Sequence, residues 1–267
     1  MNDLKICLVQ CSLVWENPEA NRRHLESMLD GLEPGTHAVF LPEMFTTGFS
    51  MQAERLAEPM DGPSVRWMQQ QARQRRTILC GSLIIRDQDA YYNRLLWVLP
   101  DGQMATYDKR HLFSYAGEHL KFRAGSKRLL AQVNGWKICL MICYDLRFPV
   151  WSRQAAAFGP SGEPAPRYDL LVYCANWPQS RIQAWSSLLP ARAIENQCYV
   201  AGVNRVGADG LGQMHTGASA LIDPGGQCIW SREDTECLHH EVLFREHLEQ
   251  IRQSYPFLND ADSFVIF

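Results

Sequence analysis

Four side chains of types that could carry out acyl-transfer chemistry stand out in this chain: Glu43, Lys109, Glu118 and Cys143. A cysteine needs a base to become a nucleophile, and acyl transfer needs a cation or N–H donors for the oxyanion of its tetrahedral intermediate. Singly, each has a plainer interpretation: an exposed loop carboxylate, a solvated lysine at a strand end, or a small core cysteine. Together they predict a cysteine-dependent acyl-transfer site.

The elements around these residues favour their meeting. Cys143 ends the apolar run 137–143, which is typical of a buried strand, and Pro149 suits the first turn of a following helix. We therefore expect the thiol at a strand-to-helix bend, near the positive end of a helix, where a thiolate is stabilised. Glu43 and Lys109 also follow apolar runs. Partial desolvation of Glu43 among apolar neighbours would suit a general base.

Strand and helix patterns alternate along the chain. The predicted strands are 5–9, 38–41, 77–85, 92–99, 104–107, 129–133, 136–143, 170–175, 199–204, 218–222 and 227–230. The predicted helices are one beginning at Asn17, then 64–76, 148–158, 182–196 and 244–254. Residues 159–166, rich in Gly and Pro, predict a surface loop, and Asp223-Pro-Gly-Gly226 predicts a type II turn. With no repeat and no dividing linker, residues 1–267 predict one α/β domain of mixed strands covered by helices.

Composition limits the function classes. The 267 residues are 46% hydrophobic and 21% charged with a net charge of −3, the proportions of an ordinary soluble protein. That charge gives no reason to expect a nucleic-acid or membrane partner. Nine cysteines without a signal-peptide pattern predict free thiols in the cytoplasm. Cys237-Leu-His-His240 lacks a second pair of ligands at zinc-like spacing, so no metal site is expected.

Three segments resemble, in order, the signature segments of the nitrilase superfamily of carbon–nitrogen hydrolases. They are Leu41-Pro-Glu-Met-Phe-Thr-Thr-Gly-Phe49, Tyr107-Asp-Lys-Arg-His-Leu-Phe113 and Ile142-Cys-Tyr-Asp-Leu-Arg-Phe-Pro149. The resemblance extends to Ala175-Asn-Trp-Pro178, Ala191-Arg-Ala-Ile-Glu-Asn196 and Gly202-Val-Asn-Arg-Val206, and so covers nearly the whole chain. The second and third segments are most similar to the omega-amidase branch, which hydrolyses 2-oxoglutaramate and 2-oxosuccinamate.

This resemblance implies a four-layer α-β-β-α sandwich that pairs into a homodimer. It implies that Glu43 is the general base, Lys109 the oxyanion stabiliser, Cys143 the nucleophile and Glu118 a second glutamate that positions the lysine and the substrate. The backbone N–H of Tyr144 would join Lys109 at the oxyanion. The implied reaction turns a small amide into its acid and ammonia through a cysteine thioester, with no cofactor or metal.

The substrate's distal carboxylate should need a cation, and Arg147 and Arg181 are candidates by position. The alternatives are a structural ion pair for Arg147 and a solvated Arg181. The aromatic candidates for the pocket wall, with ordinary core packing as the alternative, are Phe49, Phe113 and Trp177. A related hydrolase acting on a nitrile, an N-carbamoyl amine or another small amide stays open, as does a non-enzymatic relative of the same fold.

Overall fold

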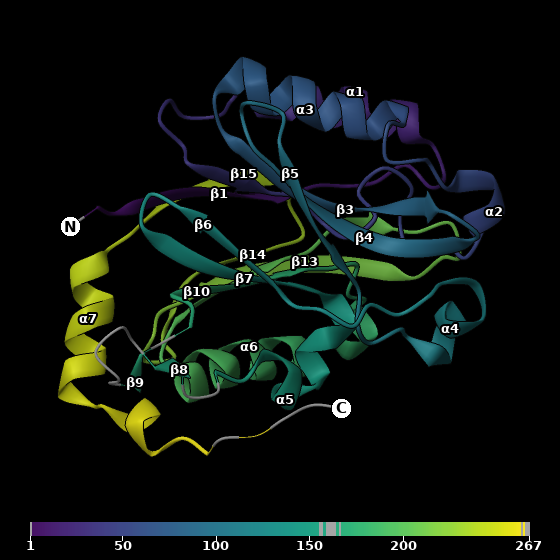
Figure 1. The fold of residues 1–267 in the computed structure, drawn as a ribbon. Helices are drawn as coiled ribbons and strands as arrows, with labels where there is room; N and C mark the ends of the chain where they lie inside the picture. Colours follow the sequence, from purple (N-terminus) through teal and green to yellow (C-terminus); the bar gives the residue numbers. More distant parts are fainter. Residues whose placement is uncertain (1, 155–156, 159–163, 166, 263, 265–267) are drawn as a thin grey trace.

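A computed structural model of the chain describes residues 2–154, 157–158, 164–165, 167–262 and 264. Two mixed sheets lie face to face between layers of helices (Figure 1). The first sheet, in spatial order, contains β15 (Cys237–Leu243), β1 (Leu4–Gln10), β2 (Ala38–Phe40), β3 (Ile78–Asp87), β4 (Ala90–Val98) and β5 (Met104–Asp108). The second contains β12 (Val206–Ala208), β13 (Met214–Ile222), β11 (Tyr199–Val203), β10 (Leu170–Cys174), β7 (Trp136–Ile142) and β6 (Leu129–Val133), with β14 (Cys228–Glu233) paired to β13.

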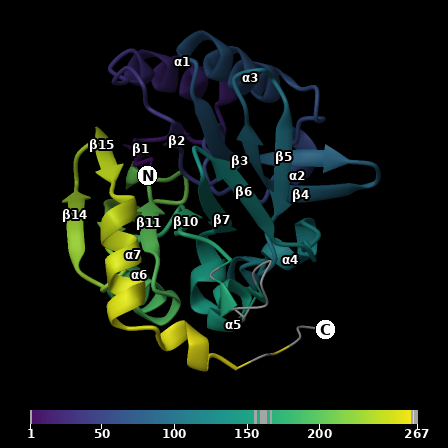
Figure 2. The same ribbon diagram turned by 60° about the vertical axis from the view of Figure 1, so that its left-hand side comes forward.

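Helices cover the outer faces of both sheets. Helices α1 (Pro18–Leu29) and α3 (Pro63–Arg75) pack side by side over the first sheet, and α5 (Pro149–Ser152) and α6 (Ile182–Asn196) lie on the side of the second (Figures 1 and 2). The remaining helices are α2 (Ala53–Leu56), α4 (Glu118–Lys121) and α7 (Arg245–Ser254). The predicted α/β class and the α-β-β-α layering are confirmed. Among the described residues, no helix is long and apolar enough to cross a membrane.

Strand β1 shows why the sandwich has two apolar interfaces. Its residues Leu4, Ile6 and Leu8 belong to the core between the two sheets, whereas Cys7 and Val9 pack into the core beneath α1 and α3. A strand presents alternate side chains to opposite faces, and both faces of β1 are covered, which explains its nearly continuous apolar run. The buried cysteines of the strands serve this packing, and all nine cysteines are free thiols.

The predicted helix over residues 148–158 is wrong in its length. Helix α5 ends at Ser152, Arg153 is extended (φ −62°, ψ 133°), and residues 157–158 form the short strand β8 (Ala157–Phe158). The chain leaves the helix because Gln154 is buried against the end of α6. Its backbone N–H and side-chain Nε2 donate to Oδ1 and O of Asn196, at 2.8 and 2.6 Å. These tertiary bonds outweigh the local helix pattern.

Other differences are local. Within the predicted loop 159–166, residues 164–165 form β9 (Pro164–Ala165), paired with β8, and the rest lie outside the described residues. The turn at residues 223–226 is not type II, because the positive φ of 92° falls on Gly226 rather than on Gly225. Strand β15, which is absent from the predicted strands, pairs antiparallel with β1 along seven residues and includes Cys237 and His240.

Candidate active site

The site lies at one edge of the sandwich, where strands of both sheets end. Glu43 follows β2 and Lys109 follows β5 in the first sheet, while Cys143 follows β7 and Asn176 follows β10 in the second. Strands β7 and β10 are parallel, so Cys143 and Asn176 leave the second sheet at the same end. Polar residues at the carboxyl ends of parallel strands are well placed to form a site.

A buried lysine bridges two buried carboxylates. Lys109 Nζ lies 2.8 Å from Glu43 Oε1 and 3.0 Å from Glu118 Oε2, and all three side chains are at most 1% exposed. Burial alone would lower the pKa of Lys109, but Glu118 and Glu43 raise it above its ordinary value, so the ammonium stays charged. Burial raises the pKa of Glu118, with Lys109 opposing the rise. A strand-end lysine in solvent is therefore excluded.

Besides Lys109, donors from two further segments orient the Glu43 carboxylate. Asn93 Nδ2, on β4, donates to Glu43 Oε1 at 2.8 Å and to Glu118 Oε1 at 3.2 Å. The backbone N–H of Asn176 donates to Glu43 Oε2 at 3.0 Å, and its side chain donates to the Glu43 carbonyl. Glu118 accepts a further bond of 2.5 Å from the N–H of Phe113. Each carboxylate is thus oriented by a lysine and by neutral donors.

Cys143 occupies a strained turn. Its φ is 42°, in the left-handed region that residues with a Cβ rarely adopt, and it opens the five-residue 3₁₀ helix Cys143–Arg147. A tight strand-to-helix turn presents a nucleophile at the end of a sheet, as in the elbow of other hydrolases. The thiol is 4.0 Å from the backbone carbonyl oxygen of Asn176. The N–H of Tyr144 lies in the first turn, whose N–H groups have no partner within the helix.

The expectation of a helix-stabilised thiolate is wrong. Burial, reinforced by the charge of Glu43, raises the pKa of Cys143 well above its ordinary value, and Lys109 offsets this only in part. The helix that follows is too short to supply a large dipole. Cys143 therefore rests as a neutral thiol, and to act as a nucleophile it would need a base to accept its proton.

Asp145, which is not among the predicted site residues, holds the turn in place. Its buried carboxylate accepts bonds from the N–H of Ile142 (3.0 Å), the hydroxyl of Tyr107 (2.7 Å), and the N–H and ring Nδ1 of His111 (3.0 and 2.8 Å). The ring of His111 stacks on the ring of Phe148, with centroids 3.8 Å apart. His111 therefore supports the turn through Asp145, and its Nδ1 is engaged there rather than with the thiol. Asn93 and Asn176 were missed as well. The signal for Asn93 is an amide that, together with Arg94, interrupts the apolar and aromatic residues of its strand, and Asp145 and Asn176 lie within the recognised segments.

A cavity of about 460 Å³ opens over the thiol. Nine of the ten predicted site residues line it: Glu43, Phe49, Lys109, Phe113, Cys143, Tyr144, Arg147, Trp177 and Arg181. Glu118 lies behind Lys109, which separates it from the cavity. Each arginine lies over an aromatic ring, Arg147 over Trp177 and Arg181 over Phe113. In both pairs the guanidinium carbon is 5.0 Å from the ring centroid. Trp177 also belongs to the core, so both interpretations offered for it hold.

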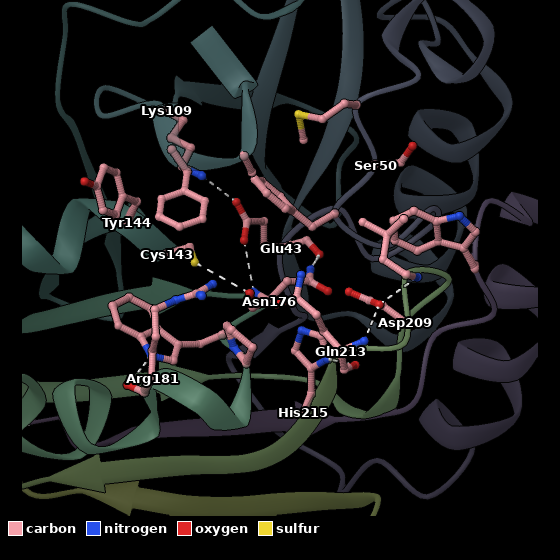
Figure 3. Close-up of a pocket in the computed structure, with 18 of the residues that line it drawn as sticks. Glu43, Ser50, Lys109, Cys143, Tyr144, Asn176, Arg181, Asp209, Gln213 and His215 are labelled. Carbon is pink, nitrogen blue, oxygen red and sulfur yellow. Dashed lines mark hydrogen bonds and ion pairs between the residues drawn. The ribbon is translucent and has the colours of Figure 1, made fainter.

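The arrangement can perform acyl transfer. Figure 3 shows Glu43 between Lys109 and Asn176, with Cys143 beside them and Arg181 on the same side of the cavity. A fixed carboxylate, a charged lysine and a thiol at one cavity supply a base, an oxyanion partner and a nucleophile. The described residues contain no group of three or more His, Cys, Asp or Glu side chains that could hold a metal ion.

Comparison with known proteins agrees with this geometry. A family model described as carbon–nitrogen hydrolase matches residues 5–238. Omega-amidase YafV of Escherichia coli K12 is 42% identical over the full length of both chains, and the 2-oxoglutaramate amidase of Bacillus subtilis is 31% identical over 96% of each. A carbon–nitrogen hydrolase superfamily protein of Xanthomonas campestris, whose crystal structure has an arsenic adduct in the active site, is 43% identical over the full length of both chains, with a TM-score of 0.95.

Fold and site together define a cysteine hydrolase of the nitrilase-like α-β-β-α class. The chain belongs to the carbon–nitrogen hydrolase family. It is thus an enzyme that hydrolyses carbon–nitrogen bonds other than peptide bonds.

Proposed function

We propose that this enzyme is an omega-amidase, which hydrolyses the terminal amide of small dicarboxylate monoamides such as 2-oxoglutaramate. The observation that carries the proposal is the pair of arginines, Arg147 and Arg181, in the cavity that holds the thiol of Cys143. Neither arginine forms an ion pair with an acidic side chain among the contacts of the described residues, so both are available to a substrate carboxylate. The names of the two amidase relatives support the same substrate class.

In this reaction Glu43 accepts the proton of the neutral thiol as Cys143 attacks the amide carbonyl carbon. The new C–S bond pushes the carbonyl electrons onto oxygen, where the Lys109 ammonium and the N–H of Tyr144 stabilise the oxyanion. When the C=O bond re-forms, the C–N bond breaks, and Glu43 passes its proton to the departing ammonia. Water, deprotonated by Glu43, then cleaves the thioester, which returns the thiol and releases the acid.

The other residues position these groups. Glu118 holds Lys109 through bonds of 3.0 and 3.2 Å and so keeps the ammonium beside Glu43. Phe49, Phe113 and Trp177 form the apolar wall against the carbon chain of the substrate. The centroid of the Phe49 ring is 5.0 Å from Lys109 Nζ. We propose further that residues 1–267 form one domain, that two copies pair into a homodimer and that the enzyme acts in the cytoplasm without a cofactor.

The test is ammonia release from a panel of small amides and one nitrile, with succinamate, 2-oxoglutaramate, propionamide and an N-carbamoyl amine as members. The proposal expects 2-oxoglutaramate and succinamate to give the highest kcat/KM. Cys143→Ala and Glu43→Gln should each abolish turnover to within assay noise. A clear preference for the nitrile or for uncharged propionamide would overturn the assignment to dicarboxylate monoamides.

A further inference from the structure

The cavity extends well beyond the groups that a five-carbon monoamide would contact. Its volume of about 460 Å³ is in the range of sites that hold drug-sized ligands. In Figure 3, Cys143, Tyr144 and Arg181 lie on one side of Glu43, and a second group of lining residues lies on the other. We call this second group the far side: Ser50, Asp209, Gln213 and His215.

The chemistry decides which part of a substrate would reach the far side. The oxyanion must lie by Lys109, and the distal carboxylate by Arg147 or Arg181. The departing nitrogen must face Glu43, because Glu43 supplies its proton. A substituent on that nitrogen would extend beyond Glu43, and in Figure 3 the far side lies across Glu43 from Cys143.

The far side is a preformed wall. The ring of Trp15 packs so closely on the loop backbone that a Cβ at Gly210 would lie 2.2 Å from it, and a Cβ at Gly48 3.0 Å from it. Behind the wall, Nη2 of the buried Arg205 donates to the carbonyls of Leu13 (3.2 Å) and Ala208 (2.9 Å). These bonds join the segment before Trp15 to the segment before Asp209. Space bounded by so fixed a wall does not close by side-chain collapse.

One carboxylate on this wall, that of Asp209, has no salt-bridge partner among the described residues. Asp209 Oδ1 accepts the backbone N–H groups of Leu211 (2.8 Å) and Gln213 (2.9 Å), and within the described part of the chain its hydrogen bonds are to such neutral donors. Glu16, also in the lining, is neutralised by Arg55. Burial lowers the pKa of His215 to about 4, so this imidazole is uncharged at neutral pH. Among the described residues, Asp209 is thus the carboxylate of this wall that forms no salt bridge, and the buried Arg205 behind the wall lies within electrostatic range of it.

We propose that the far side is an amine subsite, so that the enzyme also hydrolyses secondary amides whose amine fragment carries a terminal ammonium group. The inference rests on the proposed function, since it uses the same nucleophile and acyl side. The bonds change as before. The C–S bond forms, the C–N bond breaks, and the proton from Glu43 goes to the substituted nitrogen, which leaves as a free amine. Water then cleaves the thioester to give the dicarboxylate.

The experiment uses the full chain and three substrates that share one product: succinamate, N-(2-aminoethyl)succinamate and N-(2-hydroxyethyl)succinamate. Succinate formation is measured, so one assay serves all three. We expect turnover of both secondary amides, with kcat/KM for the aminoethyl compound about threefold above that for the hydroxyethyl compound, the size of a solvent-screened ion pair. Asp209→Asn keeps the Oδ1 acceptor and removes the charge, and should bring this ratio to about one.

The ratio within one variant does not depend on how much of it is folded. Asp89→Asn, at an exposed residue between β3 and β4 that does not line the cavity, is the matched control and should keep the parental ratio. Hydrolysis of succinamate without either secondary amide would refute the subsite and leave the proposed function standing. Hydrolysis of the secondary amides alone would refute the proposed function and support the subsite. An unchanged ratio in Asp209→Asn would refute the role of its charge.

Discussion

The substitution Asp145→Asn tests whether one buried carboxylate holds the turn at Cys143, the proposed nucleophile, in place. Asp145 accepts four hydrogen bonds, two at each oxygen: from Ile142 and Tyr107 at Oδ2, and from two groups of His111 at Oδ1. An asparagine can keep one acceptor oxygen. Its amide NH₂ would replace the second oxygen and face the two donors that now donate to that oxygen. Two hydrogen bonds to a charged acceptor are therefore lost.

A hydrogen bond to a charged group contributes about 1.5–3 kcal/mol, so the two together are worth about 3–6 kcal/mol of folding free energy. In a chain of this size each kcal/mol shifts the melting temperature by about 2–4 °C, which gives a decrease of at least roughly 6 °C. The strained φ of 42° at Cys143 would also relax. Misplacing a reacting atom by about 1 Å can cost a factor of roughly 100 in kcat.

The assays are thermal unfolding and ammonia release at saturating substrate. Asp87→Asn is the control, because the side chain of Asp87 is 44% exposed and its partner Arg94 keeps Asp108. That change should cost less than about 1 kcal/mol. If Asp145→Asn melts within about 2 °C of the parent and keeps its kcat, the carboxylate does not support the turn, and the reasoning fails.

Lys109→Met leaves Glu43 and Glu118 buried without their cation and should lower the free energy of unfolding by about 3–5 kcal/mol in urea titration; an unchanged midpoint would contradict the buried triad. Arg147→Gln should raise KM for 2-oxoglutaramate about tenfold or more and leave KM for propionamide unchanged, whereas equal effects on both would argue against carboxylate binding. Burial raises the pKa of the Cys7 and Cys139 thiols from 9.0 to about 12. Between pH 9 and pH 12 these thiols therefore lose their protons in the unfolded chain but keep them in the folded one. The free energy of unfolding should then fall by about 1.4 kcal/mol per pH unit for each thiol. Urea unfolding at pH 8 and pH 10 measures this loss of stability. If a Cys7→Ala/Cys139→Ala variant loses as much stability between these pH values as the parent, the two thiols are not its cause.

The meeting of Glu43, Lys109 and Cys143 was predictable because the strands that precede them were. Glu43, Lys109 and Cys143 each follow a short apolar run, and strand ends on one edge of a sandwich converge. Helix α1 was predictable from its local signals, since Asn17 caps it through a bond of 3.1 Å to the N–H of Ala20 and Pro18 opens it.

What sequence reasoning missed depends on distant partners. The end of α5 is set by Gln154 bonding to Asn196, 42 residues away. The role of Asp145 comes from Tyr107 and His111 on another segment, so its place within a recognised segment does not reveal its partners. The thiol of Cys143 was expected to be acidic because a helix follows it, but burial and Glu43 outweigh five residues of 3₁₀ helix. Each miss is a tertiary effect that overrides a local preference.

The most direct measurement of the central claim is the mass of the enzyme during turnover. Acid quenching of the reaction with 2-oxoglutaramate, followed by intact-protein and peptide mass spectrometry, should reveal an acyl group of the substrate, less ammonia, on the peptide that contains Cys143. The adduct should be absent from Cys143→Ala. An acyl group on any other residue, or sustained turnover by Cys143→Ala, would contradict the account.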